Sequence, residues 1–331
     1  MSKALQVMPF VYGRSDPGSR PGIIIMFGQI CKACGKPIWG NALIALNAAW
    51  HPEHFLCAAC HQPIGGMVFH VHEGRPYHPA CLTQYVLPRC VFCGKPLIGE
   101  FLVDQWGNQY CKEHQGQYPP CAYCGRLVPP EMQEEYGQHD AVRCPLCRKS
   151  AIETVKDAQP VFSQLKQWVS GQGLRYNNLP IALELCGRTT LASYLRDQHD
   201  HHTLGATLST TYTADGRIVQ NRVDKIAVLR GLPSFLFEGI VIHELGHAWL
   251  IVHGIQNLPQ WAEEGFCELL AYRYYGEQGT EMARYRRESM LRNPDPIYGE
   301  GFRRMRTLAQ HVGFEQLLEH LRITKRLPTL H

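Results

Sequence analysis

The segment Trp50-His51-Pro52-Glu53-His54-Phe55-Leu56-Cys57-Ala58-Ala59-Cys60 decides the fold of the N-terminal half, because it holds a histidine pair and a cysteine pair, each with two residues inside the pair. Around it, the chain has 14 cysteines and 17 histidines, and 12 of the cysteines lie between Cys31 and Cys147. A secreted disulfide framework is the alternative, but histidine has no role in one, whereas imidazole is a good zinc ligand. The pattern therefore predicts zinc sites.

The ligand residues fall into four sets of four. In the first two sets, 16 and 17 residues separate the two pairs, and only two residues lie between the sets. In the last two sets the separations are 17 and 19, with six residues between the sets. Four protein ligands close a tetrahedral site, so each set predicts one structural zinc ion, with His139 as an alternative in the fourth set. The sets are Cys31, Cys34, His51 and His54; Cys57, Cys60, His78 and Cys81; Cys90, Cys93, Cys111 and His114; and Cys121, Cys124, Cys144 and Cys147.

The first two sets have the spacing of a LIM domain, and residues 50–55 resemble the LIM core sequence. The resemblance implies that Trp50 and Phe55 pack between the two zinc modules. LIM domains usually have cysteine at the position of His54. Because imidazole also binds zinc, we predict that His54 is a ligand; the alternative is a surface histidine. The last two sets have a longer spacer and are called LIM-like. Gly-Lys-Pro recurs at 35–37 and 94–96, which predicts a tight turn and marks an internal repeat.

The composition changes beyond Cys147, where the metal pairs stop. Apolar residues between Val161 and Val169 are spaced as one helical face, and 207–229 reads as a hairpin around Ala214-Asp215-Gly216. We predict four regions: a flexible tail at 1–29 with one short strand at 23–27, a LIM domain at 30–86, a LIM-like zinc module at 87–152 and a catalytic domain at 153–331. Each zinc module is too small for its own core and depends on its metal.

The segment His243-Glu244-Leu245-Gly246-His247 carries the pattern His-Glu-x-x-His. On a helix His243 and His247 project from one face and can grip one zinc ion, while Glu244 can act as general base. Pro233 upstream and Gly254 downstream fit a helix between them. A helix with two ordinary histidines is the alternative. We therefore predict a catalytic zinc site here, with a fifth zinc ion in the chain.

A third ligand is predicted in Trp261-Ala262-Glu263-Glu264-Gly265-Phe266, where 16 residues separate His247 from Glu264. This segment resembles the second motif helix of gluzincin metallopeptidases, which implies Glu264 as the ligand and leaves Glu263 as the alternative. Three protein ligands leave one position open for water, as a catalytic site requires. Glu268, one turn further on, is a candidate partner of a ligand imidazole. Cys186 and Cys267 are read as small core residues.

Over residues 31–328 the chain resembles the plant LIM peptidases of the DA-one family, because five features occur in the same order. These features are the LIM module, the LIM-like module, the His-Glu-x-x-His helix, the Glu-Glu-Gly segment and Ile297-Tyr298-Gly299-Glu300-Gly301-Phe302-Arg303. The resemblance implies a ubiquitin-activated peptidase that cleaves regulatory proteins, and Tyr298 as a candidate second oxyanion donor. Two departures are visible: the tail shows no acidic Leu-Ala-Ser helix of the ubiquitin-interacting type, and Leu245-Gly246 stands where the plant proteins have Met-Met.

The sequence thus predicts an α+β fold: two small β-rich LIM and LIM-like zinc modules, then a mainly helical gluzincin-like metallopeptidase domain with a small β-sheet. The expected activity is zinc-dependent endopeptidase hydrolysis of protein substrates. A LIM adaptor with an inactive peptidase fold is the alternative. The formal charge of +4 is small and scattered, which disfavours nucleic acid as a partner, and no apolar run of about 20 residues predicts a membrane span. We expect a soluble, cytoplasmic protein with protein partners on its LIM half.

Overall fold

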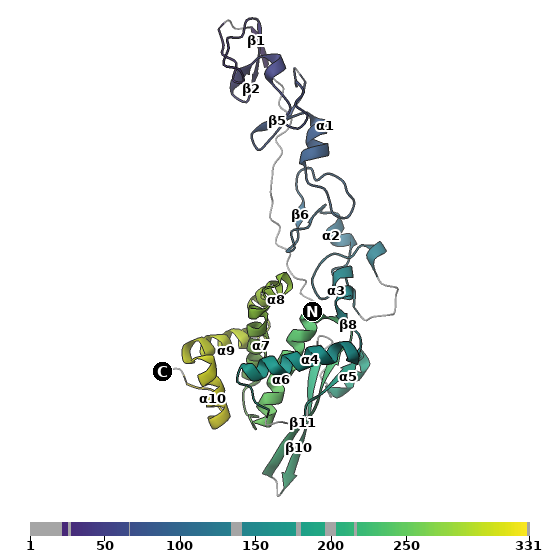
Figure 1. Cartoon of the computed structure of the whole chain (residues 1–331), viewed down its shortest axis with the longest axis vertical. Helices are drawn as coiled ribbons and strands as arrows, with labels where there is room; N and C mark the ends of the chain where they lie inside the picture. Colours follow the sequence, from purple (N-terminus) through teal and green to yellow (C-terminus); the bar gives the residue numbers. More distant parts are fainter. Residues whose placement is uncertain are drawn as a thin grey trace. The chain divides into compact units, whose positions relative to one another are not determined.

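The computed structural model describes residues 22–25, 28–65, 67–133, 141–176, 180–195, 203–214 and 217–329, and the predicted tail therefore lies almost wholly outside it. The described chain forms two compact units. The first comprises Met1–Pro120 and Gly125–Glu131, and the second comprises Cys121–Cys124 and Met132–His331. Each unit is described separately below, and Figure 1 labels their elements.

The first unit consists of small antiparallel sheets and single helical turns, as the zinc-module prediction requires. One sheet has three strands in the order β1-β2-β3, and two more have two strands each. The strand expected at 23–27 is β1, which pairs with β2 and so belongs to the first module's sheet. The strands are β1 (Gly22–Ile25), β2 (Asn41–Ala45), β3 (Ala48–Trp50), β4 (His70–His72), β5 (Arg75–Tyr77), β6 (Leu102–Val103) and β7 (Gln109–Tyr110). The short helices are η1 (Pro52–His54), α1 (Pro79–Cys81), η2 (Leu82–Val86) and α2 (His114–Gln117), and η3 (Pro130–Met132) begins where this unit ends.

The cysteine pairs sit on repeated tight turns. In each of the four repeats an isolated antiparallel bridge closes the loop around a Cys-x-x-Cys pair, at Ile30↔Pro37, Leu56↔Pro63, Arg89↔Pro96 and Pro120↔Leu127. Gly35 and Gly94 both have a φ of +69°, which glycine adopts without steric penalty. The tight turn predicted from the recurring Gly-Lys-Pro is therefore confirmed.

Aromatic side chains form the small core of the LIM domain. Phe55 is fully buried, lies 5.4 Å from Trp50 and 5.1 Å from Phe69 between ring centroids, and joins a cluster that also contains Leu43 and Ile64. The cluster draws on residues near both zinc sets, so the predicted packing of Trp50 and Phe55 is observed. It is a small core, which is why a domain of this size depends on its metal.

The second unit is rich in helix around one three-stranded sheet of order β10-β11-β9. The predicted hairpin is β10 (Gly205–Ala214) and β11 (Arg217–Leu229), which pair antiparallel; its turn at 215–216 lies outside the described residues. The strand β9 (Ala182–Cys186) adds in parallel to β11, so β10 is an edge strand of this sheet. The helices are α3 (Pro145–Lys149), α4 (Val155–Gly171), α5 (Arg188–Tyr194), α6 (Ser234–Val252), α7 (Gln260–Glu277), α8 (Glu281–Arg292), α9 (Gly299–Val312) and α10 (Phe314–Thr324).

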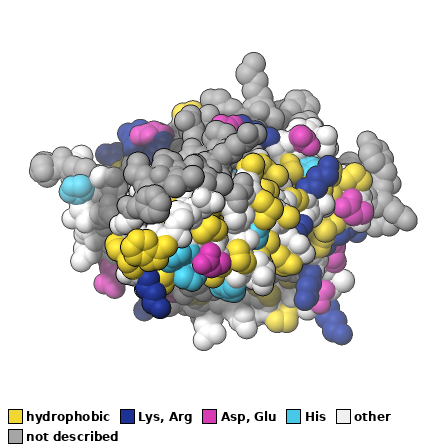
Figure 2. Space-filling view, turned by 90° about the horizontal axis from the view of Figure 1, so that it is seen from above, with side chains coloured by type: hydrophobic (Ala, Val, Ile, Leu, Met, Phe, Trp, Pro, Cys, Tyr) yellow, Lys and Arg dark blue, Asp and Glu magenta, His cyan; other side chains and the backbone are white. Residues whose placement is uncertain are grey.

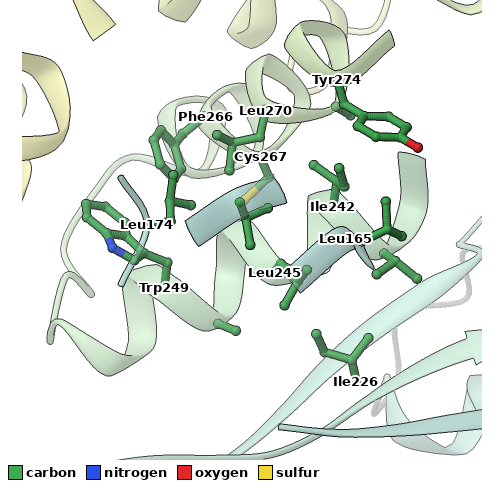
Figure 3. Close-up of a cluster of buried hydrophobic side chains, with 14 of the residues drawn as sticks. Leu165, Leu174, Ile226, Ile242, Leu245, Trp249, Phe266, Cys267, Leu270 and Tyr274 are labelled. Carbon is green, nitrogen blue, oxygen red and sulfur yellow. The ribbon is translucent and has the colours of Figure 1, made fainter. Parts of the chain in front are cut away.

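Helix α6 lies at the centre of the second unit's core. Figure 3 shows its side chains meeting those of α7 on one side, with Ile226 of β11 in the same cluster. Because α6 contacts other elements on nearly all sides, its sequence is apolar almost all round. By length and composition it is the one described helix that could cross a membrane, but 67% of its most apolar window is buried inside the fold.

The fourth cysteine set belongs to this second unit, so the region predicted as one LIM-like module at 87–152 is divided between the two units. A two-stranded sheet pairs β8 (Ala151–Ile152), just after the set, with β12 (Leu232–Pro233), just before α6. The backbone N–H of Ser234 donates to Ser150 O at 2.8 Å, and Tyr123 packs against the main core. The fourth set is thus attached to the first turn of α6.

Helices α7 and α9 cross with their backbones in close contact. A Cβ on Gly265 would lie 2.4 Å from Gly301 O, and a Cβ on Gly301 would lie 2.2 Å from Trp261 O. Any larger residue at either position would force the helices apart. These two glycines come from the Glu-Glu-Gly and Tyr-Gly-Glu-Gly segments, and the crossing brings both segments to the same place.

Candidate zinc-peptidase centre

Each of the four Cys/His sets comes together in the structure, with all ligand atoms of a set within 4.8 Å of one another. The Sγ of Cys31 lies 3.6 Å from His54 Nδ1, and the Sγ of Cys124 lies 3.6 Å from that of Cys144. Ligands on a tetrahedral zinc ion with bonds of about 2.0–2.3 Å are separated by roughly 3.3–3.8 Å. The four sets therefore fit zinc, and His54 occupies a ligand position of the first set.

The acidity of Cys31 supports metal binding by the first set. Burial alone would raise the pKa of Cys31, but hydrogen bonds from the backbone N–H groups of His51 and Cys34 hold it at about 5. A thiol with a lowered pKa is a thiolate at neutral pH, which is the form that binds zinc.

Helix α6 presents His243 and His247 on one face, one turn apart. It begins after Pro233 and ends before Gly254, whose φ is +65°, as the sequence predicts. The two Nε2 atoms lie 3.1 Å apart. At Gly246, between the histidines, a Cβ would lie 2.9 Å from Cys267 Sγ, so a glycine there lets α7 approach the ligand face.

Glu264 of α7 completes the triangle of ligand atoms. Its Oε2 lies 3.1 Å from His243 Nε2 and 3.4 Å from His247 Nε2. Three atoms separated by 3.1, 3.1 and 3.4 Å are close enough together for one zinc ion to bind all three, although two of the separations are slightly shorter than in an ideal tetrahedron. The donor set of two imidazoles and one carboxylate is that of a catalytic zinc centre with an open position.

The other candidates for the third ligand fit less well. Glu263 Oε1 lies 3.3 Å from Nδ1 of His247, on the outer edge of that ring, and its side chain is 37% exposed against 14% for Glu264. Cys267 also lies within 4.8 Å of both histidines. Burial raises the pKa of its thiol, however, which disfavours the thiolate form that binds zinc. Cys267 is fully buried in the main core, as the sequence predicts, and its position near the two histidines is an additional feature that the sequence did not indicate.

Carboxylates face the outer nitrogens of both rings. Glu268 Oε1 lies 3.1 Å from Nδ1 of His243, an ion-pair distance, although the direction from the ring is not that of a good hydrogen bond. At His247, the outer nitrogen Nδ1 faces Glu263 Oε1 at 3.3 Å. Such outer carboxylates fix the ring orientation and direct Nε2 toward the metal. Glu268 is placed as the sequence predicts.

The groups of the triangle shift one another's pKa values strongly. Burial alone would lower the pKa of His243, but contacts with Glu264 and Glu268 raise it well above its ordinary value. Burial alone would raise the pKa of Glu264, but the two imidazoles hold it well below its usual range. Because imidazole binds zinc in its neutral form, zinc binding to these histidines, whose pKa values are raised, would be linked to the release of protons.

Glu244 lies beside the triangle and is held by strand β10. Thr207 Oγ1 lies 2.7 Å from Glu244 Oε2 and 2.9 Å from the backbone oxygen of the same residue. The strand can come this close because residue 205 is glycine: a Cβ there would lie 2.9 Å from Glu244 Oε1. No spacing in the sequence indicated Thr207 or Gly205, because these residues contact Glu244 only when β10 packs against α6.

Tyr298 stands at the start of α9, with its ring centroid 6.3 Å from that of His243. The glycine crossing of α7 and α9 places it there. Its backbone N–H donates to Asp295 Oδ1 at 2.8 Å, which anchors the residue at the edge of the site. The structure thus brings Tyr298 close to the candidate ligands of the fifth site, and Glu244 lies next to His243 in the same helix.

Charge on the described surface is mixed. On the face drawn in Figure 2, the described basic and acidic side chains are interspersed with apolar ones.

Family models of known proteins match a segment in each half of the chain. Residues 31–87 match the family model of the LIM domain, and residues 183–292 match the family model described as DA1-like, Protein DA1. The chain is 26% identical to Protein DA1 of Arabidopsis thaliana over 93% of this chain and 70% of the relative. It is also 26% identical to Protein DA1-related 1 of Arabidopsis thaliana (99% and 72%) and to LIM domain-containing protein HDR3 of Oryza sativa subsp. japonica (91% and 74%).

Proposed function

We propose that this chain, which carries a LIM domain and a DA1-like domain and has DA1 and DA1-related proteins as homologues, is a zinc-dependent endopeptidase that hydrolyses peptide bonds in protein substrates. The single observation that carries the proposal is the triangle of His243 Nε2, His247 Nε2 and Glu264 Oε2, in the helix where Glu244 directly follows His243. A structural site would need a fourth protein ligand; Cys267 lies near both histidines, but burial raises the pKa of its thiol and so disfavours the thiolate form that binds zinc. We also propose a gluzincin-like fold for the second unit.

His243, His247 and Glu264 would hold the metal. When bound, zinc polarises the substrate carbonyl and the attacking water and stabilises negative charge on oxygen. Glu244 takes a proton from the attacking water and returns it to the leaving amine, acting first as general base and then as general acid. Tyr298, at the edge of the site, would donate a hydrogen bond to the developing oxyanion.

The edge strand β10 supports the proposal that the substrate is a peptide. In the sheet order β10-β11-β9, the outer edge of β10 has no neighbouring strand among the described residues. Its Thr207 touches Glu244, so an extended peptide that adds to this edge would pass close to the base. Strand addition supplies main-chain hydrogen bonds and leaves side-chain choice to neighbouring pockets.

The LIM half would bind a protein partner and so recruit the substrate or regulate its cleavage. Its four-ligand zinc sets have no open position, so they are structural, and exposed apolar side chains such as Trp39 and Ile98 offer contact area to a protein partner. We propose cytoplasmic protein substrates and a protein partner on this half, with ubiquitin one candidate through the family resemblance.

Hydrolysis of casein or a tagged protein by the purified full-length chain tests the proposal. We expect cleavage that Glu244→Gln abolishes and that removal of zinc suppresses, with re-addition restoring it. An adaptor with an inactive peptidase fold would bind partners through its LIM modules but leave every substrate intact. Cleavage that persists at the same rate in Glu244→Gln would refute the assignment of Glu244 as the base.

A further inference from the structure

We propose that Thr207 of β10 is a positioning residue that fixes the carboxylate of Glu244 for its work as general base. The inference rests on the proposed function, because it assigns a role in the same site. Thr207 is not a metal ligand and lies on the sheet, 37 residues before Glu244 in the sequence. It would act through Glu244 and would not itself touch the reacting atoms.

The contact geometry is unusual in that one hydroxyl reaches both ends of one residue. Thr207 Oγ1 is within hydrogen-bond distance of Glu244 Oε2 at 2.7 Å and of the Glu244 backbone oxygen at 2.9 Å. Both partners are acceptors, so the single hydroxyl proton is shared between them or alternates. The Glu244 side chain is thereby tied to its own helix backbone, which restricts the rotation that would carry the carboxylate away.

The strand also fills the space on the other side of the carboxylate. A Cβ at Gly205 would lie 2.9 Å from Glu244 Oε1, 3.0 Å from Glu244 Cγ and 2.6 Å from Ile240 Cγ2. Glu244 is only 6% exposed. A base enclosed in this way has few alternative rotamers, and a correctly held base spends more of its time in the reactive geometry.

The same strand contains a matched control. Thr210 Oγ1 donates to Asp224 Oδ2 at 2.6 Å, and this hydrogen bond helps to lower the pKa of Asp224. Thr210 thus makes the same kind of bond to a carboxylate outside the site. Thr210→Val removes an equal group from the same strand without touching Glu244.

The first experiment compares kcat and KM of Thr207→Val, Thr207→Ser and Thr210→Val in the full-length zinc-loaded protein, with a peptide substrate. Loss of one hydrogen bond to a charged group corresponds to roughly a tenfold change in rate. We expect Thr207→Val to lose about tenfold in kcat with KM, zinc content and melting temperature little changed. Thr207→Ser should restore most of the rate, and Thr210→Val should match the wild type.

Three outcomes would overturn the inference: equal kcat in the two valine variants, a rise in KM alone, which would make Thr207 part of the substrate wall, or no rescue by serine. The second experiment does not need activity. With ¹³C-labelled glutamate side chains, the Glu244 carboxyl resonance is assigned by its loss in Glu244→Gln, and it should shift in Thr207→Val and stay in Thr210→Val. An inactive wild type would refute the proposed function, whereas an unmoved resonance would refute the Thr207 contact.

Discussion

Arg143 offers the sharpest test of how the fourth cysteine set supports helix α6. It lies one residue before Cys144, and its side chain is 4% exposed. Its Nη1 donates to Glu153 Oε1 at 2.8 Å and to Gly231 O at 2.9 Å, three residues before α6 begins. Gly231 has a φ of +81°, and a Cβ there would lie 2.9 Å from Arg143 Nη1. The substitution Arg143→Met keeps an apolar stem and removes both bonds.

The expected loss follows from the burial of the two partners. Glu153 is 39% exposed and can turn to water, so its bond contributes little. The Gly231 carbonyl is part of a buried turn and would be left without this donor, which costs about 1–3 kcal/mol, and the charge-assisted bond itself is at the upper end of that range. We therefore expect a loss of about 2–3 kcal/mol. For a unit of roughly 200 residues this lowers Tm by about 4–12 °C.

The assay is thermal unfolding of the zinc-loaded full-length protein, followed by a probe in the second unit such as tryptophan fluorescence or circular dichroism. Arg148→Met is the matched control. Arg148 lies in α3 of the same unit, and its side chain has no hydrogen bond to another described residue. We expect the control to stay within about 1–2 °C of the wild type. Equal Tm values for the two variants would refute the structural role of Arg143.

The other predictions concern the ligands, the base and the helix packing. Glu244→Gln should retain zinc and lose about 10²–10⁴-fold in kcat, and an unchanged rate would move the base elsewhere. Glu264→Ala should weaken zinc binding by more than about 100-fold, whereas Glu263→Ala should stay within the 10–100-fold typical of an outer partner; the reverse order in metal titrations would exchange their roles. Gly239→Ala places a Cβ 1.9 Å from a tyrosine hydroxyl of α7 and should destabilise by about 1–3 kcal/mol in denaturant melts, while Gly276→Ala, whose nearest atom is 3.5 Å away, should not. Elemental analysis should find about five zinc ions per chain, and a value near one would refute the closed sites.

Much of the metal chemistry was predictable from the sequence because it depends on local spacing. Cys-x-x-Cys pairs and the i, i+4 histidines place their side chains together within a turn or a helix, whatever the rest of the fold does. Glu264 was predictable for a different reason, since the segment around it resembles a known motif. The structure places Glu264 with both histidines and leaves Glu263 at the outer edge of His247.

The rest of the site could not be read from spacing because it depends on contacts between distant elements. Thr207 reaches Glu244 only after β10 packs against α6, and Cys267 approaches the histidines only where Gly246 admits α7. The parallel strand β9 was also missed, since its pairing with β11 joins segments 43 residues apart at Lys225↔Ala182. Long-range pairing of this kind leaves no periodic signal in either segment.

The division of the chain into two units changes how the zinc sites relate to the proposed chemistry. The sequence grouped the third and fourth sets as one LIM-like module, and the structure places the third in the first unit and the fourth, an all-cysteine set, in the second. The bonds from Arg143 to Gly231 and from Ser234 to Ser150 attach the fourth set to the start of α6, and the ligand histidines lie further along the same helix. Because a small zinc module is stable only with its metal, loss of that zinc would loosen the start of α6. The fourth structural zinc is therefore better understood as part of the framework of the proposed catalytic domain than as part of a separate binding module.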